Sequence, residues 1–259
     1  MDYRKIFDTI PKEFDKWRPR YCAGLFSDII KFSQLDSSKA VLEIGPGTGQ
    51  ATEPILKTGC AYLAIEIGEN FVEFMNNKYN SHNNFKLVNA DFELYDFEKE
   101  SFDLVYSAAA FQWIKEDIGY PKVYNMLKSG GVFATFGVAS GSRVPALNDK
   151  IQEVYAEHFK TEFDYEKYIK ARNSDSEELS RIDKLKKYGF IDAEQRHYSN
   201  TREFNCEDYI SYIQTHSTHI ALKEPYKSKF YAGIKDVIMS FGGQVTLNDD
   251  IILHIGRKP

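Results

Sequence analysis

Short apolar runs alternate with amphipathic stretches over the first 138 residues. The apolar runs predict buried strands at 40–44, 62–67, 85–89, 102–107 and 132–137. Apolar side chains at helical spacing predict helices at 22–35, 48–57 and 70–79. A further helix is expected to carry Pro121 in its first turn and to end near Lys128, before Gly130-Gly131. Apolar strands separated by helices are typical of a parallel sheet covered on both faces.

The pattern changes after residue 138. Residues 141–188 are polar and mostly helical, and a strand returns at 191–198. A second helical stretch covers 206–241, and 244–256 predict a terminal strand or a hairpin turning at Asn248-Asp249-Asp250. We therefore expect an α/β core made of 1–138, 189–204 and 242–259. Residues 139–188 and 205–241 would form a helical cap beside a ligand crevice, with the acidic run 175–178 starting a helix.

The most informative segment is the loop Gly45-Pro46-Gly47-Thr48-Gly49, which follows a strand ending in Glu43-Ile44. Glycines without a Cβ let the backbone approach a ligand closely. The dinucleotide fingerprint GxGxxG requires a third glycine where this chain has Gln50. The loop therefore favours a nucleotide-like ligand that lacks a pyrophosphate.

Five motifs in order resemble those of the class I S-adenosylmethionine-dependent methyltransferases, including the methyltransferase type 11 domain. They are the GxGxG loop, Glu66 after the second strand, Asn89–Phe92, Phe102–Trp113 and Leu127–Phe133. The resemblance implies a Rossmann-like, doubly wound, mostly parallel seven-stranded sheet with an antiparallel C-terminal strand. It also implies S-adenosyl-L-methionine as cofactor, with Glu66 on the ribose and Asp91 on the adenine. The implied cofactor-binding residues are Arg18, Tyr21, Glu43, Gly45, Pro46, Gly47, Thr48, Gly49, Glu66, Ile67, Asp91, Phe92, Ala108, Phe111 and Gln112.

Two segments narrow the resemblance to small-molecule methyltransferases of the trans-aconitate methyltransferase-like group. These are 14–21, which contains Arg18-Pro19-Arg20-Tyr21, and 111–114, which contains Trp113. In that group Arg18 would pair with the cofactor's carboxylate and Tyr21 would close over the pocket. The alternatives are that Arg18 is a surface charge, that Tyr21 packs on the first helix and that Trp113 belongs to the core. Glu43, Glu66 and Asp91 also have plain alternatives, as a strand-end acid, a helix-cap acid and a turn residue, respectively.

The predicted substrate-pocket residues are Trp113, Tyr212 and His216. His216 is the candidate catalytic residue, as a general base or a hydrogen-bonding group for the acceptor. His219 lies three positions on, so the two rings are expected on one helix face. A histidine pair without a neighbouring carboxylate is weak evidence for metal, and no metal site is predicted. The aromatic residues of the insert, Tyr155, Phe159, Phe163, Tyr165 and Tyr168, could line the pocket or form helical core.

Composition limits the function classes. The 259 residues carry a net charge of −5, which does not suggest a nucleic-acid partner. The three cysteines are far apart, and the N-terminus lacks an apolar signal-like run. We expect a cytoplasmic protein without membrane segments, as a monomer or homodimer.

Three functions stay open on these residues. The first is methyl transfer to a small molecule, with a carboxylic acid as one candidate acceptor. The second is transfer to a hydroxyl, amine or carbon, and the third is binding of the cofactor or its demethylated product without catalysis. An NAD-dependent oxidoreductase is disfavoured by Gln50.

Overall fold

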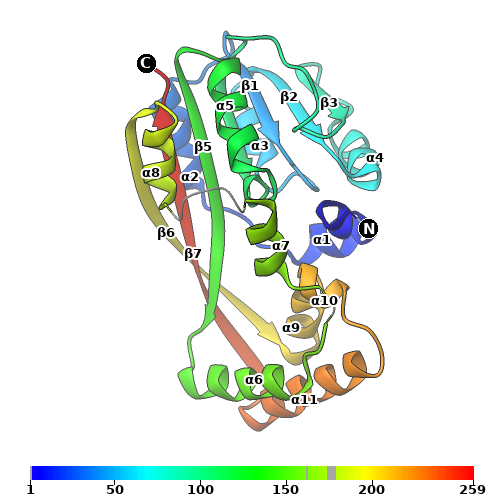
Figure 1. The fold of residues 1–259 in the computed structure, drawn as a ribbon. Coiled ribbons are helices and arrows are strands. Elements are labelled where there is room, and N and C mark those ends of the chain that lie inside the picture. Colours follow the sequence, from blue (N-terminus) through cyan, green and yellow to red (C-terminus); the bar gives the residue numbers. More distant parts are fainter. Residues whose placement is uncertain (1, 162, 174–178) are drawn as a thin grey trace.

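The computed structural model describes residues 2–161, 163–173 and 179–259 of the chain. The strands in these residues form one seven-stranded sheet. Its order is β3-β2-β1-β4-β5-β7-β6. Strands β1 to β4 pair in parallel, as do β4 and β5, whereas β7 runs antiparallel to β5 and β6 (Figure 1). The strands are β1 Ala40–Ile44, β2 Ala61–Glu66, β3 Phe85–Asn89, β4 Phe102–Ala108, β5 Leu127–Ser142, β6 Ile191–Asn205 and β7 Gln244–Arg257. The predicted Rossmann-like fold with an antiparallel C-terminal strand is confirmed.

Helices cover both faces of the sheet. On one face α2 (Ala23–Ser33), α3 (Thr52–Leu56) and α4 (Glu69–Tyr79) pack over side chains such as Val41 and Leu104. On the other face α5 (Glu116–Met126) and α8 (Arg181–Lys187) pack over Leu42 and Val105. Neighbouring residues of one strand thus enter different cores, because successive side chains of a strand point to opposite faces.

The last three strands continue beyond the core and carry a helical layer. The helices α6 (Pro145–His158), α9 (Cys206–Ile213) and α11 (Tyr226–Ser240) lie against the far ends of β6 and β7 (Figure 1). Phe230, Ile234 and Leu247 are fully or almost fully buried in a separate apolar cluster there. Extended strands, and not a flexible linker, therefore fix this cap relative to the sheet.

The N-terminal segment lies across the carboxyl ends of the first strands. It contains the 3-10 helix η1 (Tyr3–Thr9) and α1 (Pro11–Trp17). The Asp8 carboxylate accepts the backbone N–H of Phe71 at 2.8 Å, near the start of α4. The Phe7 ring contacts Trp113 of the 3-10 helix η2 (Phe111–Trp113), and the Phe14 ring contacts Phe71. Two short helices, α7 (Tyr165–Arg172) and α10 (Ser217–Ile220), complete this side.

Three sequence-based predictions of elements are wrong in detail. Helix α5 begins at Glu116 and keeps Pro121 in its interior, because Asn173 Oδ1 accepts the Glu116 N–H from another segment. Helix α3 begins only at Thr52, since the glycine loop before it adopts left-handed backbone. At the C-terminus the predicted terminal strand is confirmed and only the hairpin alternative is wrong, because Asp249 and its neighbours pair continuously with β5 and β6.

The packing of α8 counts against part of the predicted cap boundary. Leu185 of α8 is buried in the core cluster with Val105 and Phe190. The predicted cap range 139–188 therefore includes a helix that covers the sheet, and the core–cap division otherwise stays a prediction. The acidic run 175–178, where a helix was predicted to start, lies outside the described residues. Within the described part of the chain, no helix has the length and apolar character needed to traverse a bilayer.

Glu43 of β1 lies in the interior, on the α2–α3–α4 face. Its Oε2 accepts the Thr52 hydroxyl at 2.6 Å and the Tyr62 hydroxyl, which in turn contacts the Tyr106 hydroxyl. Its Oε1 has no hydrogen-bond partner. Burial raises the pKa of Glu43 to about 7 despite these donors. This acid is held in the core at a cost in stability that depends on pH.

We predict that Ile251→Ala destabilises the protein by about 2–5 kcal/mol, the usual cost of a large cavity. Ile251 is 0% exposed in β7, between β5 and β6. Ile191→Ala is the matched control, because that isoleucine is 47% exposed on β6 and should change stability by less than about 1 kcal/mol. Urea unfolding measures both, and equal losses would contradict the burial.

We predict that Glu43→Gln gains stability relative to wild type as the pH rises from about 4.5 to about 7. In that interval the folded Glu43 keeps a proton that the unfolded chain has lost, so ionisation opposes folding. The difference should reach roughly 3 kcal/mol at most, since one pKa unit corresponds to about 1.4 kcal/mol. Urea unfolding at several pH values measures the difference. A flat or falling difference would contradict the assignment. The exposed Glu53, whose pKa is lowered by Lys57, should show no such rise in Glu53→Gln.

Candidate functional site

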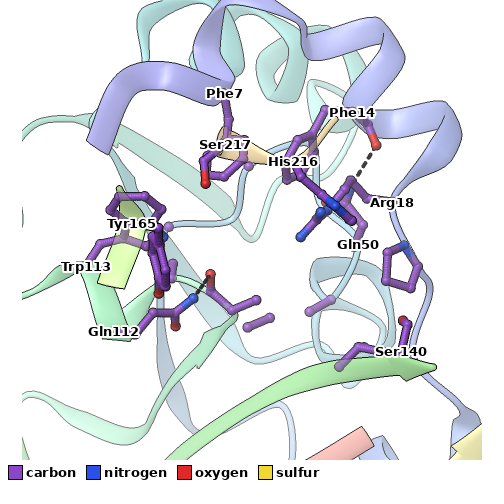
Figure 2. A pocket seen from close by; sticks show the side chains of 18 of the residues that line it. Phe7, Phe14, Arg18, Gln50, Gln112, Trp113, Ser140, Tyr165, His216 and Ser217 are labelled. Atoms are coloured by element: carbon purple, nitrogen blue, oxygen red, sulfur yellow. Dashed lines mark hydrogen bonds between the residues drawn. The ribbon is translucent and has the colours of Figure 1, made fainter. Parts of the chain in front are cut away.

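A cavity of about 520 Å³ opens at the carboxyl ends of the central strands. Its floor follows β1, β2 and β4, its roof is the N-terminal segment, and its far wall belongs to the cap (Figure 2). The position lies between β1 and β4, where the strand order reverses. Open α/β sheets bind ligands at such a switch point, and the volume is that of an ordinary small-molecule site.

The glycine loop forms one wall of the cavity with its backbone. Gly45, Gly47 and Gly49 have φ of +66°, +58° and +83°, a region that side chains disfavour. A Cβ on Gly45 would lie 2.5 Å from the Cβ of Ala110, in the loop after β4. The two loops therefore touch at Gly45, and the backbone of Gly45, Pro46 and Gly47 faces the cavity.

Glu66 presents a buried carboxylate at the end of β2. Its Oε2 accepts the Gly47 N–H at 3.1 Å and its Oε1 accepts the Gly68 N–H at 2.9 Å. The residue is 6% exposed and lines the cavity. Burial raises the pKa of Glu66 to about 7, against the two backbone donors that favour its ionised form. A carboxylate fixed in this way can accept a pair of hydroxyl groups from a ligand.

Asp91 follows β3 and is paired across the cavity with the N-terminal segment. Its Oδ2 lies 2.8 Å from Arg4 Nη1, and its Oδ1 accepts the Glu93 N–H in a local turn. Asp91 therefore makes the turn bond considered from the sequence and also lines the cavity beside Ala90 and Phe92. A ligand that reaches Asp91 would meet Arg4 as well.

Arg18 points into the cavity near Gln50 and His216 (Figure 2). Its guanidinium lies over the Phe14 ring, and among the described residues it has no carboxylate within ion-pair distance. Burial lowers the pKa of Arg18. The surface-charge alternative is therefore wrong for Arg18. The Tyr21 ring lines the cavity and also packs edge-on against Phe26 of α2 and Phe136, and its closing over a bound cofactor stays a prediction.

The cap wall is aromatic and uncharged at its surface. Tyr155, Tyr209 and Tyr212 line it together with His216 and Ser217. The His216 ring packs against Tyr212 at 4.9 Å between centroids and makes no side-chain hydrogen bond within the described part of the chain. Burial lowers the pKa of His216 well below its usual value, with nearby Arg18 acting in the same direction. His216 is therefore a neutral imidazole with free donor and acceptor positions.

His219 differs from His216 although it is close in sequence. Its Nε2 lies 2.9 Å from the Tyr155 hydroxyl and its Nδ1 lies 3.1 Å from the Tyr231 hydroxyl. His216 stands before the first residue of α10, whereas His219 belongs to that helix. The expected common helix face is therefore wrong, and His219 is a hydrogen-bonded core residue.

The structure gathers most of the predicted site residues in this cavity. Those that line it are Arg18, Tyr21, Gly45, Pro46, Gly47, Glu66, Ile67, Asp91, Phe92, Ala108, Gln112, Trp113, Tyr212 and His216. Glu43, Thr48, Gly49 and Phe111 do not line it, which counts against a direct ligand contact for these four. Glu43 and Thr48 are wholly buried, Gly49 packs against Met75 and Tyr79, and Phe111 packs on Tyr120 and Phe133.

Sequence reasoning missed several lining residues. Arg4, Phe7 and Phe14 come from an N-terminal segment that carried no strand or helix prediction. Ser140 comes from the part of β5 that extends past the predicted strand end. Ala109 follows β4 in a left-handed conformation with φ of +53°, a strain often found at functional sites. In the sequence, only the run of small residues after β4 indicated that Ala109 lies at a cavity.

Known proteins match this chain over part of its length. Residues 42–135 match a family model described as a methyltransferase domain. The sterol 24-C-methyltransferase of Debaryomyces hansenii is 30% identical over 139 residues, covering 51% of this chain and 35% of that protein. A malonyl-[acyl-carrier protein] O-methyltransferase of Marinomonas is 25% identical over 148 residues, covering 56% and 54%. The chain thus spans about half or less of the curated relatives it matches.

Solved structures extend the likeness of the fold to nearly the whole chain. A candidate type II methyltransferase of Anaeromyxobacter dehalogenans has a TM-score of 0.64 at 17% identity, covering 93% of this chain and 97% of that one. Phosphoethanolamine N-methyltransferase 2 of Haemonchus contortus, solved with S-adenosyl-L-methionine, has a TM-score of 0.57 at 17% identity, covering 97% and 57%. Residues 42–135 therefore match a methyltransferase domain, and the fold of nearly the whole chain resembles that of solved methyltransferases.

Proposed function

We propose that this protein is an S-adenosylmethionine-dependent methyltransferase that acts on a small-molecule acceptor. The observation that carries the proposal is the hydrogen bond that the Glu66 carboxylate accepts from the Gly47 N–H at the cavity. In a pyrophosphate site the loop amides face phosphate oxygens. Here a carboxylate already accepts one of those amides, which disfavours a second anion and favours a hydroxyl-bearing, phosphate-free ligand.

The residues present fit this cofactor. Glu66 would accept the ribose hydroxyls, and the space beside Ala90, Asp91 and Phe92 would take the adenine. Arg18, a half-buried cation without a carboxylate partner among the described residues, would pair with the amino-acid carboxylate of the cofactor. When bound, the cofactor supplies an activated methyl group on a sulfonium.

The chain itself would contribute mainly position and the exclusion of water. Trp113, Tyr165 and Phe7 close one side of the cavity (Figure 2). Tyr212 also lines the cavity. Fixing the reacting groups in line supplies much of the rate enhancement in such transfers. His216, neutral and facing the cavity, would hydrogen-bond the acceptor and could take its proton if the acceptor is a hydroxyl.

The size of the cavity supports a small acceptor. About 520 Å³ must hold the cofactor and the acceptor together, and this volume is typical of one drug-sized ligand. The similar proteins include O-, C- and N-methyltransferases, so they differ in the atom that receives the methyl group. The class of acceptor therefore depends on the side chains that line this chain's own cavity.

Isothermal titration calorimetry with S-adenosylhomocysteine and, separately, NADH tests the proposed function. We expect saturable one-to-one binding of S-adenosylhomocysteine and no measurable binding of NADH. The physical reason is the Glu66 carboxylate, which would repel a pyrophosphate at the loop. Tighter binding of NADH, or no binding of S-adenosylhomocysteine by folded protein, would contradict the proposal.

We predict that Glu66→Gln weakens S-adenosylhomocysteine binding by about 1–3 kcal/mol, the cost of losing hydrogen bonds to a charged acceptor. Glu69→Gln is the matched control, because Glu69 lies three residues later on the exposed first turn of α4 and does not line the cavity. Its affinity should stay within about twofold of wild type. Equal affinities of the wild type and Glu66→Gln would remove Glu66 from the site.

A further inference from the structure

The charged groups of the cavity are distributed unevenly. At the end where the adenine would bind, beside Asp91, the charges of Arg4 and Asp91 cancel in an ion pair, with 2.8 Å between Arg4 Nη1 and Asp91 Oδ2. Glu66 is held by the glycine loop. At the other end Arg18 is the single charged lining residue in the described part of the chain, and no Asp or Glu side chain of β5, α6, α9, α10 or β7 lines the cavity there.

The charged residues behind the cap wall, which contains Tyr212, do not supply a net negative charge to the cavity either. Asp249 is 1% exposed and does not line the cavity, and it is bound by Arg202 through Nε and Nη2. Arg202 stacks on the rear of Tyr212, with its guanidinium 4.4 Å from the ring centroid. Its Nη1 is buried without a hydrogen-bond partner. The wall that carries Tyr212 is therefore backed by a compensated ion pair whose cation lies against the ring.

Figure 2 shows Arg18 and His216 pointing into the same part of the cavity, opposite Trp113 and Tyr165. The cofactor that we propose would add two positive groups, an ammonium and a sulfonium, and one carboxylate. Even with that carboxylate on Arg18, the acceptor position faces a net positive charge. A cationic amine there would be desolvated without a protein carboxylate, which is strongly unfavourable.

We propose that the acceptor binds in this cavity as an anion, with a carboxylate or phenolate oxygen between Arg18 and His216. This inference rests on the proposed function and names the substrate class of that site. The rest of the acceptor is small and carries both apolar and polar groups. The adjoining lining combines Ile151, Tyr155, Tyr209 and Leu247 with the polar side chains of Ser140, Asn148 and Gln152. An acceptor that enters ionised has no proton to lose, so His216 serves as a neutral donor to the anionic oxygen.

A matched series of probes tests the charge preference directly. Protein saturated with S-adenosylhomocysteine is titrated by calorimetry with benzoate, benzyl alcohol and benzylamine, which differ mainly in the charge of one group. We expect benzoate to bind and benzylamine to bind at least tenfold more weakly. Hexanoate serves as a second, aliphatic carboxylate for a pocket that rejects a ring.

The Arg18→Gln variant, kept saturated with S-adenosylhomocysteine, tests the residue. Its affinity for benzoate should fall roughly ten- to hundredfold, as for a lost charge-assisted hydrogen bond, while its affinity for benzyl alcohol should stay within about threefold. Arg18→Lys should keep part of the preference. Arg20→Gln is the matched control, since Arg20 is exposed two residues away, pairs with Asp15 and does not line the cavity.

Three outcomes would overturn the inference. Benzylamine could bind as tightly as benzoate, or both carboxylates could fail to bind the S-adenosylhomocysteine-loaded protein. Arg18→Gln could also weaken S-adenosylhomocysteine alone and leave benzoate unchanged, which would limit Arg18 to the cofactor. Failure of S-adenosylhomocysteine itself to bind would instead refute the proposed function, so the two failures are distinguishable.

Discussion

The fold and the site meet in one interaction, the Glu66 carboxylate held between the N–H groups of Gly47 and Gly68. It joins the end of β2 to the loop after β1 and to the residue before α4. Three glycines in left-handed backbone allow the loop to bend over this carboxylate. The same bend brings Gly45 against Ala110, so the loops after β1 and β4 form one continuous wall.

The N-terminal segment and the cap depend on this framework from opposite sides. Asp8 accepts N–H groups of Asn70 and Phe71 at the start of α4, and Arg4 pairs with Asp91 after β3. The segment is therefore tied to the start of α4 and to the loop that follows β3, where Phe71 and Asp91 line the cavity. On the other side, β5 and β7 run without interruption from the core into the cap. The cavity is enclosed by elements that are each anchored in the central sheet.

Much of the core could be predicted because its physics is local. Five apolar runs and a loop of alternating glycines specify the strands and the turn in neighbouring residues. The start of α5 could not be predicted, since Asn173 of a distant segment caps Glu116. The extent of β7 was predicted closely, but the choice between one strand and a hairpin stayed open, because Asp249 looks like a turn residue until Arg202 of β6 pairs with it.

The site shows the same division between local and distant causes. Gly47, Glu66 and Asp91 follow strands directly, so motif spacing suffices to bring them to one edge of the sheet. Glu43 was assigned to the cavity because it precedes the loop, but its position in β1 directs it to the face with Tyr62 and Tyr106. Only the three-dimensional structure shows that Arg4 pairs with Asp91 and that Arg18 has no carboxylate partner among the described residues.

The most direct test of this account is a crystal structure of the complex with S-adenosylhomocysteine. The account predicts the ribose hydroxyls on Glu66, the adenine beside Asp91 and Phe92, and the sulfur facing the space between Arg18 and His216. A nucleoside bound elsewhere, or a ribose without contact to Glu66, would contradict it.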